Sequence, residues 1–234
     1  MTRIHCVSLT GWRGGCAQPM EVPVRDLVLA GWTGRDPAHV EAHIRELAAL
    51  GIPPPAKTPV FYRVASTLLT TDCSIEVIGT DSTGEVEFLL LNHGGEIWVG
   101  VGSDHTDRKM EAIGITASKQ LCRKPISPEV WCLPEVEPHW DQLRLRSYAH
   151  SNGRTELYQE ENLAALRHPR NLIELYDRTA TAPFREQGTV IFSGTPATLE
   201  GFRWADKFII ELEDPVLGRC LKHEYTIRSL EIAD

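Results

Sequence analysis

Two glutamates at alternate positions of an apolar segment are the residues best suited to do chemistry in this chain. Glu85 and Glu87 open the run 84–91, and side chains two apart on a strand point to the same face. Neighbouring carboxylates repel each other, and a run this apolar is expected to be buried, where an unpaired charge is costly. We therefore expect a positive group between the two glutamates.

A third acid follows on the next predicted strand. Asp104 lies 17 residues after Glu87, beyond a turn predicted at 93–95. A strand over 97–101, antiparallel to the first, would bring Asp104 close to the glutamates. Three oxygen ligands without a thiolate or paired histidines suit Mg²⁺, Mn²⁺ or Ca²⁺ better than zinc. The alternative is that Glu85 and its neighbour lie on a solvated strand face and bind nothing.

A histidine and a glutamate lie three positions apart on a predicted helix. Asp36 and Pro37 suit its first positions, and Gly51 suits its end. His43 and Glu46 would then be neighbours on one helix face. A carboxylate beside an imidazole orients the ring and raises its pKa, which prepares a general base that works near neutral pH. The alternative is a surface pair without a catalytic role.

The order of these motifs resembles the fumarylacetoacetate hydrolase superfamily. The matching segments are Glu-x-Glu at 85–87, Gly-x-Asp-x-Thr-x-Arg at 102–108, Ser-Lys at 118–119, Gly-Thr-Pro at 194–196 and a closing strand pair from 208 to 218 onward. The resemblance implies a mixed, mainly β fold, with a rolled, barrel-like sheet and short flanking helices. We expect residues 1–35 to form an N-terminal arm, partly loop, and a first strand over 22–29, packed on a catalytic domain over 36–234.

The resemblance also assigns residues to a site. It implies that the metal, Mg²⁺ or else Mn²⁺ or Ca²⁺, is held by Glu85, Glu87 and Asp104. It implies catalytic roles for His43, Glu46 and Lys119, and substrate contacts from Arg63, Arg108 and Thr195. Without the resemblance, the lysine would be read as a surface cation. The threonine could bind a ligand carboxylate through its hydroxyl and backbone N–H, or could be an ordinary turn residue.

The chain departs from the family pattern at three places. Val40 and its neighbours replace the Asn-Tyr that usually precedes the histidine. Asp107 replaces a small residue, and Lys109 replaces an aspartate. The last two replacements indicate altered substrate contacts rather than loss of the metal.

Three functions follow as hypotheses. The first is a divalent-metal-dependent hydrolase that cleaves a carbon–carbon bond in a β-diketone or acylpyruvate-like acid through a metal-stabilised enolate. The second uses the same site as a decarboxylase, hydratase or isomerase of a 2-oxo acid. The third is a non-catalytic protein of the same fold that binds a small acid. In each, the partner is a small carboxylic acid.

Composition bears on the remaining partners and on location. The 234 residues carry a formal net charge of -8, which argues against non-specific nucleic-acid binding. No run reaches the ~20 apolar residues of a membrane span. The six cysteines form no Cys-x-x-Cys pair, so we expect a reducing, cytoplasmic setting. The resemblance implies a homodimer, in which Trp131, Trp140 and Trp204 line the interface or else belong to the core.

Overall fold

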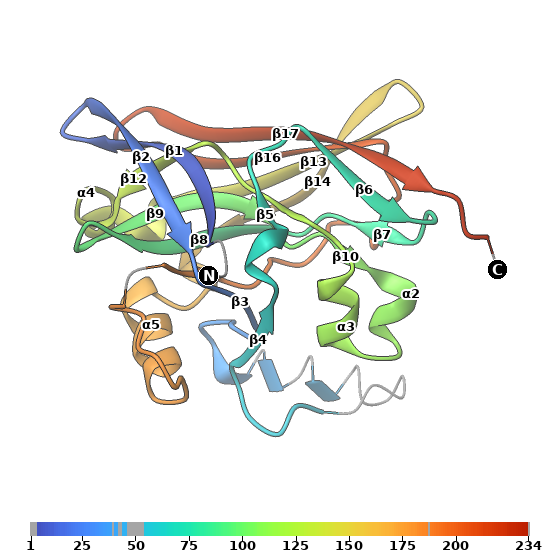
Figure 1. Cartoon of the computed structure of the whole chain (residues 1–234), viewed down its shortest axis with the longest axis horizontal. Helices are drawn as coiled ribbons and strands as arrows, with labels where there is room; N and C mark the ends of the chain where they lie inside the picture. Colours follow the sequence, from blue (N-terminus) through green and yellow to red (C-terminus); the bar gives the residue numbers. More distant parts are fainter. Residues whose placement is uncertain (1–3, 39, 42–43, 46–53, 187, 234) are drawn as a thin grey trace.

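Two β-sheets packed face to face form the framework of this computed structural model, which describes residues 4–38, 40–41, 44–45, 54–186 and 188–233. Within those residues the larger sheet has eight strands, in the order β2 (Cys16–Val24), β1 (His5–Arg13), β12 (Glu129–Cys132), β9 (Glu96–Ser103), β8 (Val86–His93), β15 (Thr189–Phe192), β3 (Asp26–Gly31) and β4 (Val60–Val64). The smaller sheet has five, in the order β14 (Arg154–Asn162), β13 (Arg144–Ser151), β16 (Lys207–Asp214), β17 (Arg219–Leu230) and β6 (Ser74–Ile78). Figure 1 shows the smaller sheet above the larger one, which curls beneath it.

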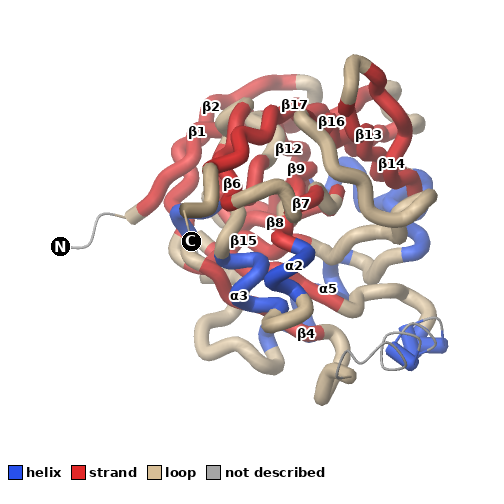
Figure 2. Tube along the Cα trace, turned by 90° about the vertical axis from the view of Figure 1, so that its right-hand side faces the viewer, coloured by secondary structure: helices blue, strands red, loops and turns tan. Residues whose placement is uncertain are grey.

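Short strand pairs and short helices complete the described part of the chain. The strand pairs are β10 (Thr106–Asp107) with β7 (Ser82–Thr83), and β11 (Lys124–Pro125) with β5 (Leu69–Thr70). The helices are α2 (Arg108–Glu111), α3 (Ile115–Gln120), α4 (Leu133–Val136) and α5 (Pro169–Asp177), with 3₁₀ turns η1 (Ser66–Leu68), η2 (Glu137–Gln142) and η3 (Leu163–Ala165). Figure 2 shows α2 and α3 side by side at one end of the larger sheet. The predicted mainly β fold with a curled sheet and short helices is confirmed.

Helical backbone is also present where the first helix was predicted. Residues 37–38, 40–41 and 44–45 are helical.

No helix of the described residues is long and apolar enough to cross a membrane.

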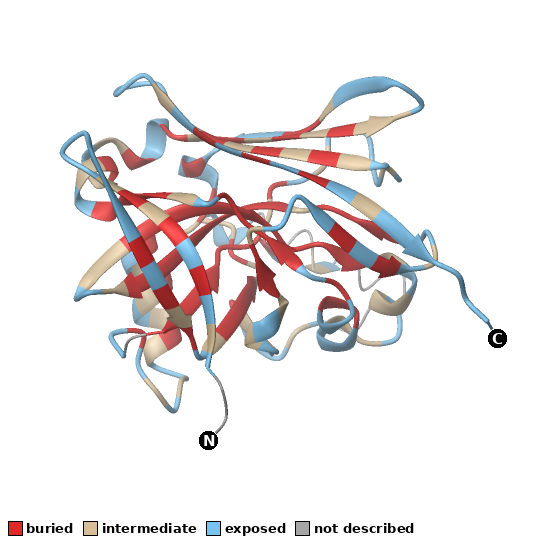
Figure 3. Cartoon of the chain, turned by 45° about the horizontal axis from the view of Figure 1, so that its top comes forward, coloured by how far each residue is buried: buried red, intermediate tan, exposed pale blue. Residues whose placement is uncertain are grey.

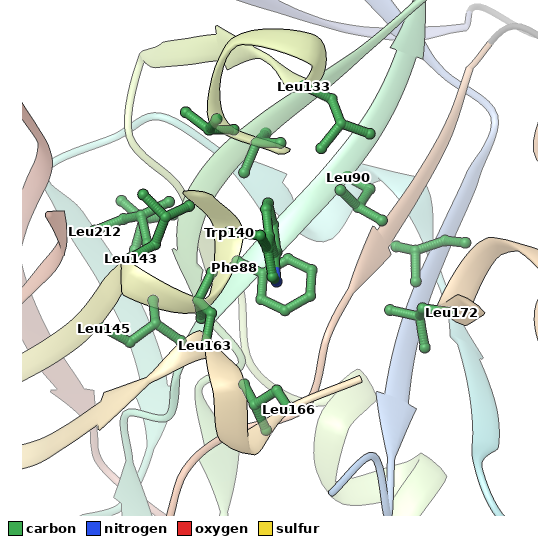
Figure 4. Packing of buried hydrophobic residues seen from close by; sticks show 14 of the residues in the cluster. Phe88, Leu90, Leu133, Trp140, Leu143, Leu145, Leu163, Leu166, Leu172 and Leu212 are labelled. Carbon is green, nitrogen blue, oxygen red and sulfur yellow. The ribbon is translucent and has the colours of Figure 1, made fainter. Parts of the chain in front are cut away.

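Strand β8 is buried on both faces, which explains its nearly continuous apolar sequence. Phe88 and Leu90 point into the core between the two sheets, where Phe88 packs edge-to-face on Trp140 with ring centroids 5.0 Å apart (Figure 4). Leu89 and Leu91 point to the opposite face and belong to a second core. Figure 3 shows the central strands of the larger sheet as an almost unbroken buried band. The glutamates therefore lie at the start of one of the most buried strands.

A two-residue turn joins β8 to β9. Gly94 and Gly95 both have positive φ, 65° and 81°, as the hairpin turn requires. The hairpin pairs Val86 with Ser103 and Glu87 with Gly102, so the antiparallel partner of β8 ends beside the glutamates. The prediction of a turn here and of an antiparallel strand leading to Asp104 is confirmed.

The N-terminal segment differs from its prediction as a loop. Residues 5–24 form the hairpin β1–β2, and β1 pairs in parallel with β12. Val7 and Leu9 are buried while their neighbours are more exposed, so the strand alternates in burial. The expectation of a loop was wrong because small and polar residues dominate the outward positions and hide this alternation. The strand predicted over 22–29 is interrupted at Arg25, between β2 and β3.

The three tryptophans considered for an interface separate into two groups. Trp131 and Trp140 are each 2% exposed and belong to the core between the sheets. Trp204 is 50% exposed and stacks beside Phe202. The homodimer stays a prediction, and the two core tryptophans are already buried within the chain.

Candidate active site

Three carboxylates converge where β8 begins and β9 ends. The backbone N–H of Asp104 donates to the carbonyl oxygen of Glu85 over 3.0 Å, which holds the end of one strand beside the start of the other. One carboxylate oxygen from each of Glu85, Glu87 and Asp104 lies within 4.8 Å of the others. Glu87 and Asp104 are 2% and 1% exposed. The predicted convergence of the three acids is therefore present in the structure.

A positive group lies among these acids, but it pairs with Asp104 and Glu85 rather than lying between Glu85 and Glu87 as the sequence predicted. Lys119, in α3, places its ammonium in contact with Asp104 Oδ2 and 3.5 Å from Glu85 Oε2. Burial disfavours the charged lysine, but the three surrounding carboxylates outweigh burial and raise its pKa. Lys119 is therefore an ammonium held by the acids rather than a surface cation.

A second lysine, which the sequence analysis missed, contacts the same aspartate. Lys124 in β11 is fully buried, lies 2.8 Å from Asp104 Oδ1 and donates to the carbonyl oxygen of His105 over 2.6 Å. Burial opposes ionisation of Asp104, yet Lys119 and Lys124 together lower its pKa to about 2. Lys124 was difficult to recognise in the sequence because it belongs to no motif and no regular spacing connects it with Asp104.

Glu87 has the opposite electrostatic surroundings. Its Oε2 accepts a 2.7 Å hydrogen bond from the backbone N–H of Gly194, and it has no ion pair with any described residue. Burial, together with repulsion from Asp104, raises the pKa of Glu87 well above its ordinary value. A buried carboxylate without a paired cation fits a site that takes up a further positive charge.

Arg108 is engaged by protein groups at each of its nitrogens. Nη2 pairs with Glu85 Oε1 over 3.0 Å, Nη1 with Glu111 over 2.9 Å, and Nε donates to Thr83 over 2.7 Å. Phe202 covers the guanidinium, with 4.3 Å between its ring centroid and the guanidinium carbon. In this structure Arg108 orients Glu85, and its predicted contact with substrate stays a prediction.

The hydroxyl of Thr195 also has partners within the protein. It donates to the carbonyl oxygen of Val86 over 3.0 Å and accepts from the Gln159 side-chain amide over 2.8 Å. The oxygen of that amide accepts from the backbone N–H of Val86 over 3.0 Å. The Gly-Thr-Pro segment thus braces the start of β8, where Gly194 contacts Glu87.

Two neighbours on β4 point to different surroundings. Arg63 lies 3.6 Å from Asp26 and 3.3 Å from the Tyr176 hydroxyl, so its described contacts are away from the three carboxylates. Tyr62 is turned toward the site, with its ring centroid 6.0 Å from Lys119 Nζ. The sequence analysis singled out Arg63 because of its match to a family position. Side chains alternate along β4, so Tyr62 lies on the opposite face from Arg63, and the contact with Lys119 identifies its face as the one turned to the site.

His43 and Glu46 lie outside the described residues. Their roles as a base and its orienting partner stay predictions.

The family model described as "Protein of unknown function (DUF2848)" matches residues 30–225. The chain belongs to the DUF2848 family. No curated protein sequence matches this DUF2848 chain significantly.

Solved structures share its fold at low sequence identity. Cg1458 superposes with a TM-score of 0.64 at 17% identity, over 91% of this chain and 80% of that one. The 2-keto-3-deoxy-D-arabinonate dehydratase complexed with magnesium and 2,5-dioxopentanoate has a TM-score of 0.61 at 14% identity, over 92% and 77%. The 4-oxalocrotonate decarboxylase from Pseudomonas putida G7, complexed with calcium and acetate, has a TM-score of 0.51 at 18% identity, over 87% and 76%. The fold of this DUF2848 protein is thus that of the fumarylacetoacetate hydrolase superfamily, as the resemblance implied.

Proposed function

We propose that this DUF2848 protein is a divalent-metal-dependent enzyme that acts on a 2-oxo acid. The supporting observation is the convergence of Glu85, Glu87 and Asp104, with carboxylate oxygens within 4.8 Å of one another. Glu87 also supports a cation site, because it is a buried carboxylate that has no ion pair among the described residues. Among the residues that the structure describes, the candidate ligands that meet at this point are all carboxylate oxygens, which favours Mg²⁺, Mn²⁺ or Ca²⁺.

A divalent cation at this position would polarise the 2-oxo group of a substrate and favour negative charge on its oxygen. Lys119 would stabilise the same developing charge, because its ammonium lies within the carboxylate cluster and is shielded from water. Arg108 would keep Glu85 oriented. The Gly194 N–H would keep Glu87 oriented.

Two reactions fit this arrangement. We infer carbon–carbon hydrolysis of an acylpyruvate-like acid first, because the motif order of the chain implies it. Decarboxylation or dehydration of a 2-oxo acid is the second candidate. It is supported by the names of two structural neighbours, a dehydratase with bound magnesium and 2,5-dioxopentanoate and a decarboxylase with bound calcium and acetate. Both reactions require negative charge to be stabilised beside the 2-oxo group.

A metal titration followed by a substrate panel tests this function. We expect isothermal titration with Mn²⁺ to give one ion per chain. With Mg²⁺ present, release of two acids from acylpyruvates would support hydrolysis. CO₂ release, or loss of water without cleavage, would support the second reaction. Binding of oxalate without turnover across the panel would indicate a non-catalytic acid-binding protein, and absence of Mn²⁺ binding would refute the metal site itself.

The predicted base gives a separate test. The His43→Ala variant should keep its fold and bind Mn²⁺ as the wild type does, because no metal ligand is changed. Turnover of the substrate found in the panel should fall by about 10²–10⁴-fold, the usual contribution of a general base. Circular dichroism and the Mn²⁺ titration serve as controls. Full activity in this variant would place the base elsewhere.

A further inference from the structure

Lys124 stands apart from the other cations near the carboxylates because the protein encloses it completely. Its side chain has 0% exposure, whereas that of Lys119 has 9% and that of Arg108 has 7%. A buried ammonium is costly unless it is paired and hydrogen-bonded. Both conditions are met, by Asp104 Oδ1 at 2.8 Å and by the carbonyl oxygen of His105 at 2.6 Å.

The backbone around Lys124 is held from two sides. β11 pairs in parallel with β5, with Lys124 opposite Leu69. Just beyond it, the N–H of Ile126 donates to Thr70 over 2.9 Å and the N–H of Ser127 donates to Val101 over 2.9 Å. Lys124 thus projects from a segment fixed between a neighbouring strand and β9, the strand that leads to Asp104.

The second partner of the ammonium is fixed as well. Both ring nitrogens of His105 form hydrogen bonds: Nδ1 with the Tyr225 hydroxyl over 3.1 Å, and Nε2 with the Ser82 hydroxyl over 2.9 Å. The carbonyl oxygen of His105 therefore belongs to a residue that is anchored at both ring nitrogens. Lys124 is placed against a rigid acceptor and has no exposed route to solvent.

The two oxygens of Asp104 consequently face different surroundings. Oδ1 faces Lys124, inside the protein. Oδ2 faces Lys119, whose ammonium also lies 3.5 Å from Glu85, so this oxygen is on the side of the glutamates. The arrangement leaves one oxygen of Asp104 for a ligand in the cluster and commits the other to the protein.

We propose that Lys124 is a positioning residue that holds Asp104 by Oδ1, so that the aspartate offers only Oδ2 to a divalent cation shared with Glu85 and Glu87. This inference rests on the proposed metal site. Because Lys124 is enclosed, it keeps this bond when a cation binds, whereas the Lys119 ammonium contacts Oδ2, the oxygen that the cation would share. Outer-shell partners of metal-binding carboxylates commonly contribute about 10–100-fold to metal affinity.

The Lys124→Met variant tests the proposal through Mn²⁺ affinity, measured by electron paramagnetic resonance of free Mn²⁺ and by calorimetry. Methionine keeps a comparable length and removes the charge and both hydrogen bonds. We expect affinity about 10–100-fold weaker than in the wild type. If repulsion between the Lys124 ammonium and Mn²⁺ dominated instead, removing the ammonium would tighten Mn²⁺ binding. Equal or tighter binding would therefore overturn the proposal.

A matched control and a second variant guard against a general loss of structure. Lys222→Met removes a lysine of β17 that pairs with Glu211 over 2.9 Å on the protein surface, and it should bind Mn²⁺ as the wild type does. Lys124→Gln retains one donor, and we expect an affinity between those of the methionine variant and the wild type. A glutamine variant with wild-type affinity would count against the proposal.

A wild-type structure with Mn²⁺ bound tests the same inference without any substitution. Lys124 should remain on Oδ1, with Asp104 coordinating through Oδ2 alone. Coordination through both oxygens, or a displaced Lys124, would overturn the inference. Failure of the wild type to bind Mn²⁺ would instead refute the proposed function, so the two failures are distinguishable.

Discussion

Replacing Glu87 with glutamine is expected to abolish metal binding and, in the absence of metal, to stabilise the protein. The substitution keeps the shape of a buried side chain and removes a carboxylate whose pKa is raised by burial and by Asp104. Affinity for Mn²⁺ should fall by at least about 100-fold, since changes to outer-shell partners alone cost about 10–100-fold. Calorimetric titration measures this loss.

Thermal unfolding should separate the two effects of this substitution. Mn²⁺ at 100 times its dissociation constant should raise the free energy of unfolding of the wild-type protein by ~2.7 kcal/mol. That corresponds to a rise of about 5–11 °C in Tm, at about 2–4 °C per kcal/mol for a chain of this size. The Glu87→Gln variant should start from a higher Tm without metal and show no rise. Glu224→Gln, on the exposed part of β17, is the control and should behave as the wild type does.

The stability difference should depend on pH in a defined direction. The folded pKa of Glu87 is raised above its unfolded value, about 4.3. The stability contributed by protonated Glu87 is therefore fully present below that unfolded value and is lost as pH rises through the folded pKa. Glutamine shows no such loss, so the gap between metal-free variant and wild type should widen from about pH 4 upward. A gap that narrows over this range would contradict the assigned environment of Glu87.

Replacing Lys119 with methionine is expected to remove catalysis while leaving the metal site intact. The ammonium contacts Asp104 and lies near Glu85, but it supplies no metal ligand, and its charge repels a divalent cation. Turnover of the substrate identified by the panel should fall by about 10²–10³-fold, as when one donor to a developing oxyanion is removed. Mn²⁺ affinity should be equal to or tighter than that of the wild type.

The combination of measurements decides between two roles for Lys119. Loss of turnover with retained Mn²⁺ binding supports direct stabilisation of substrate charge. Loss of both would mean that the lysine mainly maintains the carboxylate cluster. Lys222→Met removes an exposed lysine far along the chain from the site, and it should leave both properties unchanged. Oxalate affinity in the presence of Mn²⁺ gives a further readout, which should weaken in Lys119→Met alone.

The three acids could be predicted from the sequence because the features that bring them together are local. Period-2 alternation places Glu85 and Glu87 on one face, and the Gly94-Gly95 turn returns the chain to deliver Asp104. Hairpin register depends on the turn and on the buried face, both of which can be read over a few residues. The order of motifs along the chain predicted the fold, through the resemblance to the fumarylacetoacetate hydrolase superfamily.

Residues whose positions depend on contacts between distant segments could not be predicted. Lys124 approaches Asp104 because the two-residue strand β11 pairs with β5, which is more than fifty residues earlier in the chain. Arg108 proved to hold Glu85 and to be covered by Phe202, which comes from a distant loop. The alternating pattern of β1 and β2 was obscured by their small and polar residues.

The sequence by itself determined the three converging acids, because strand periodicity and a tight turn act over short distances. The mainly β fold followed from the order of motifs, through the resemblance to the fumarylacetoacetate hydrolase superfamily. Only the tertiary structure decided which cation contacts which oxygen. It also decided that Glu87 is left without a paired charge in the part of the chain that is described. The physical reason is that the charge state of a buried group depends on its burial and on every neighbour within a few ångströms, and those neighbours come from segments far apart in sequence.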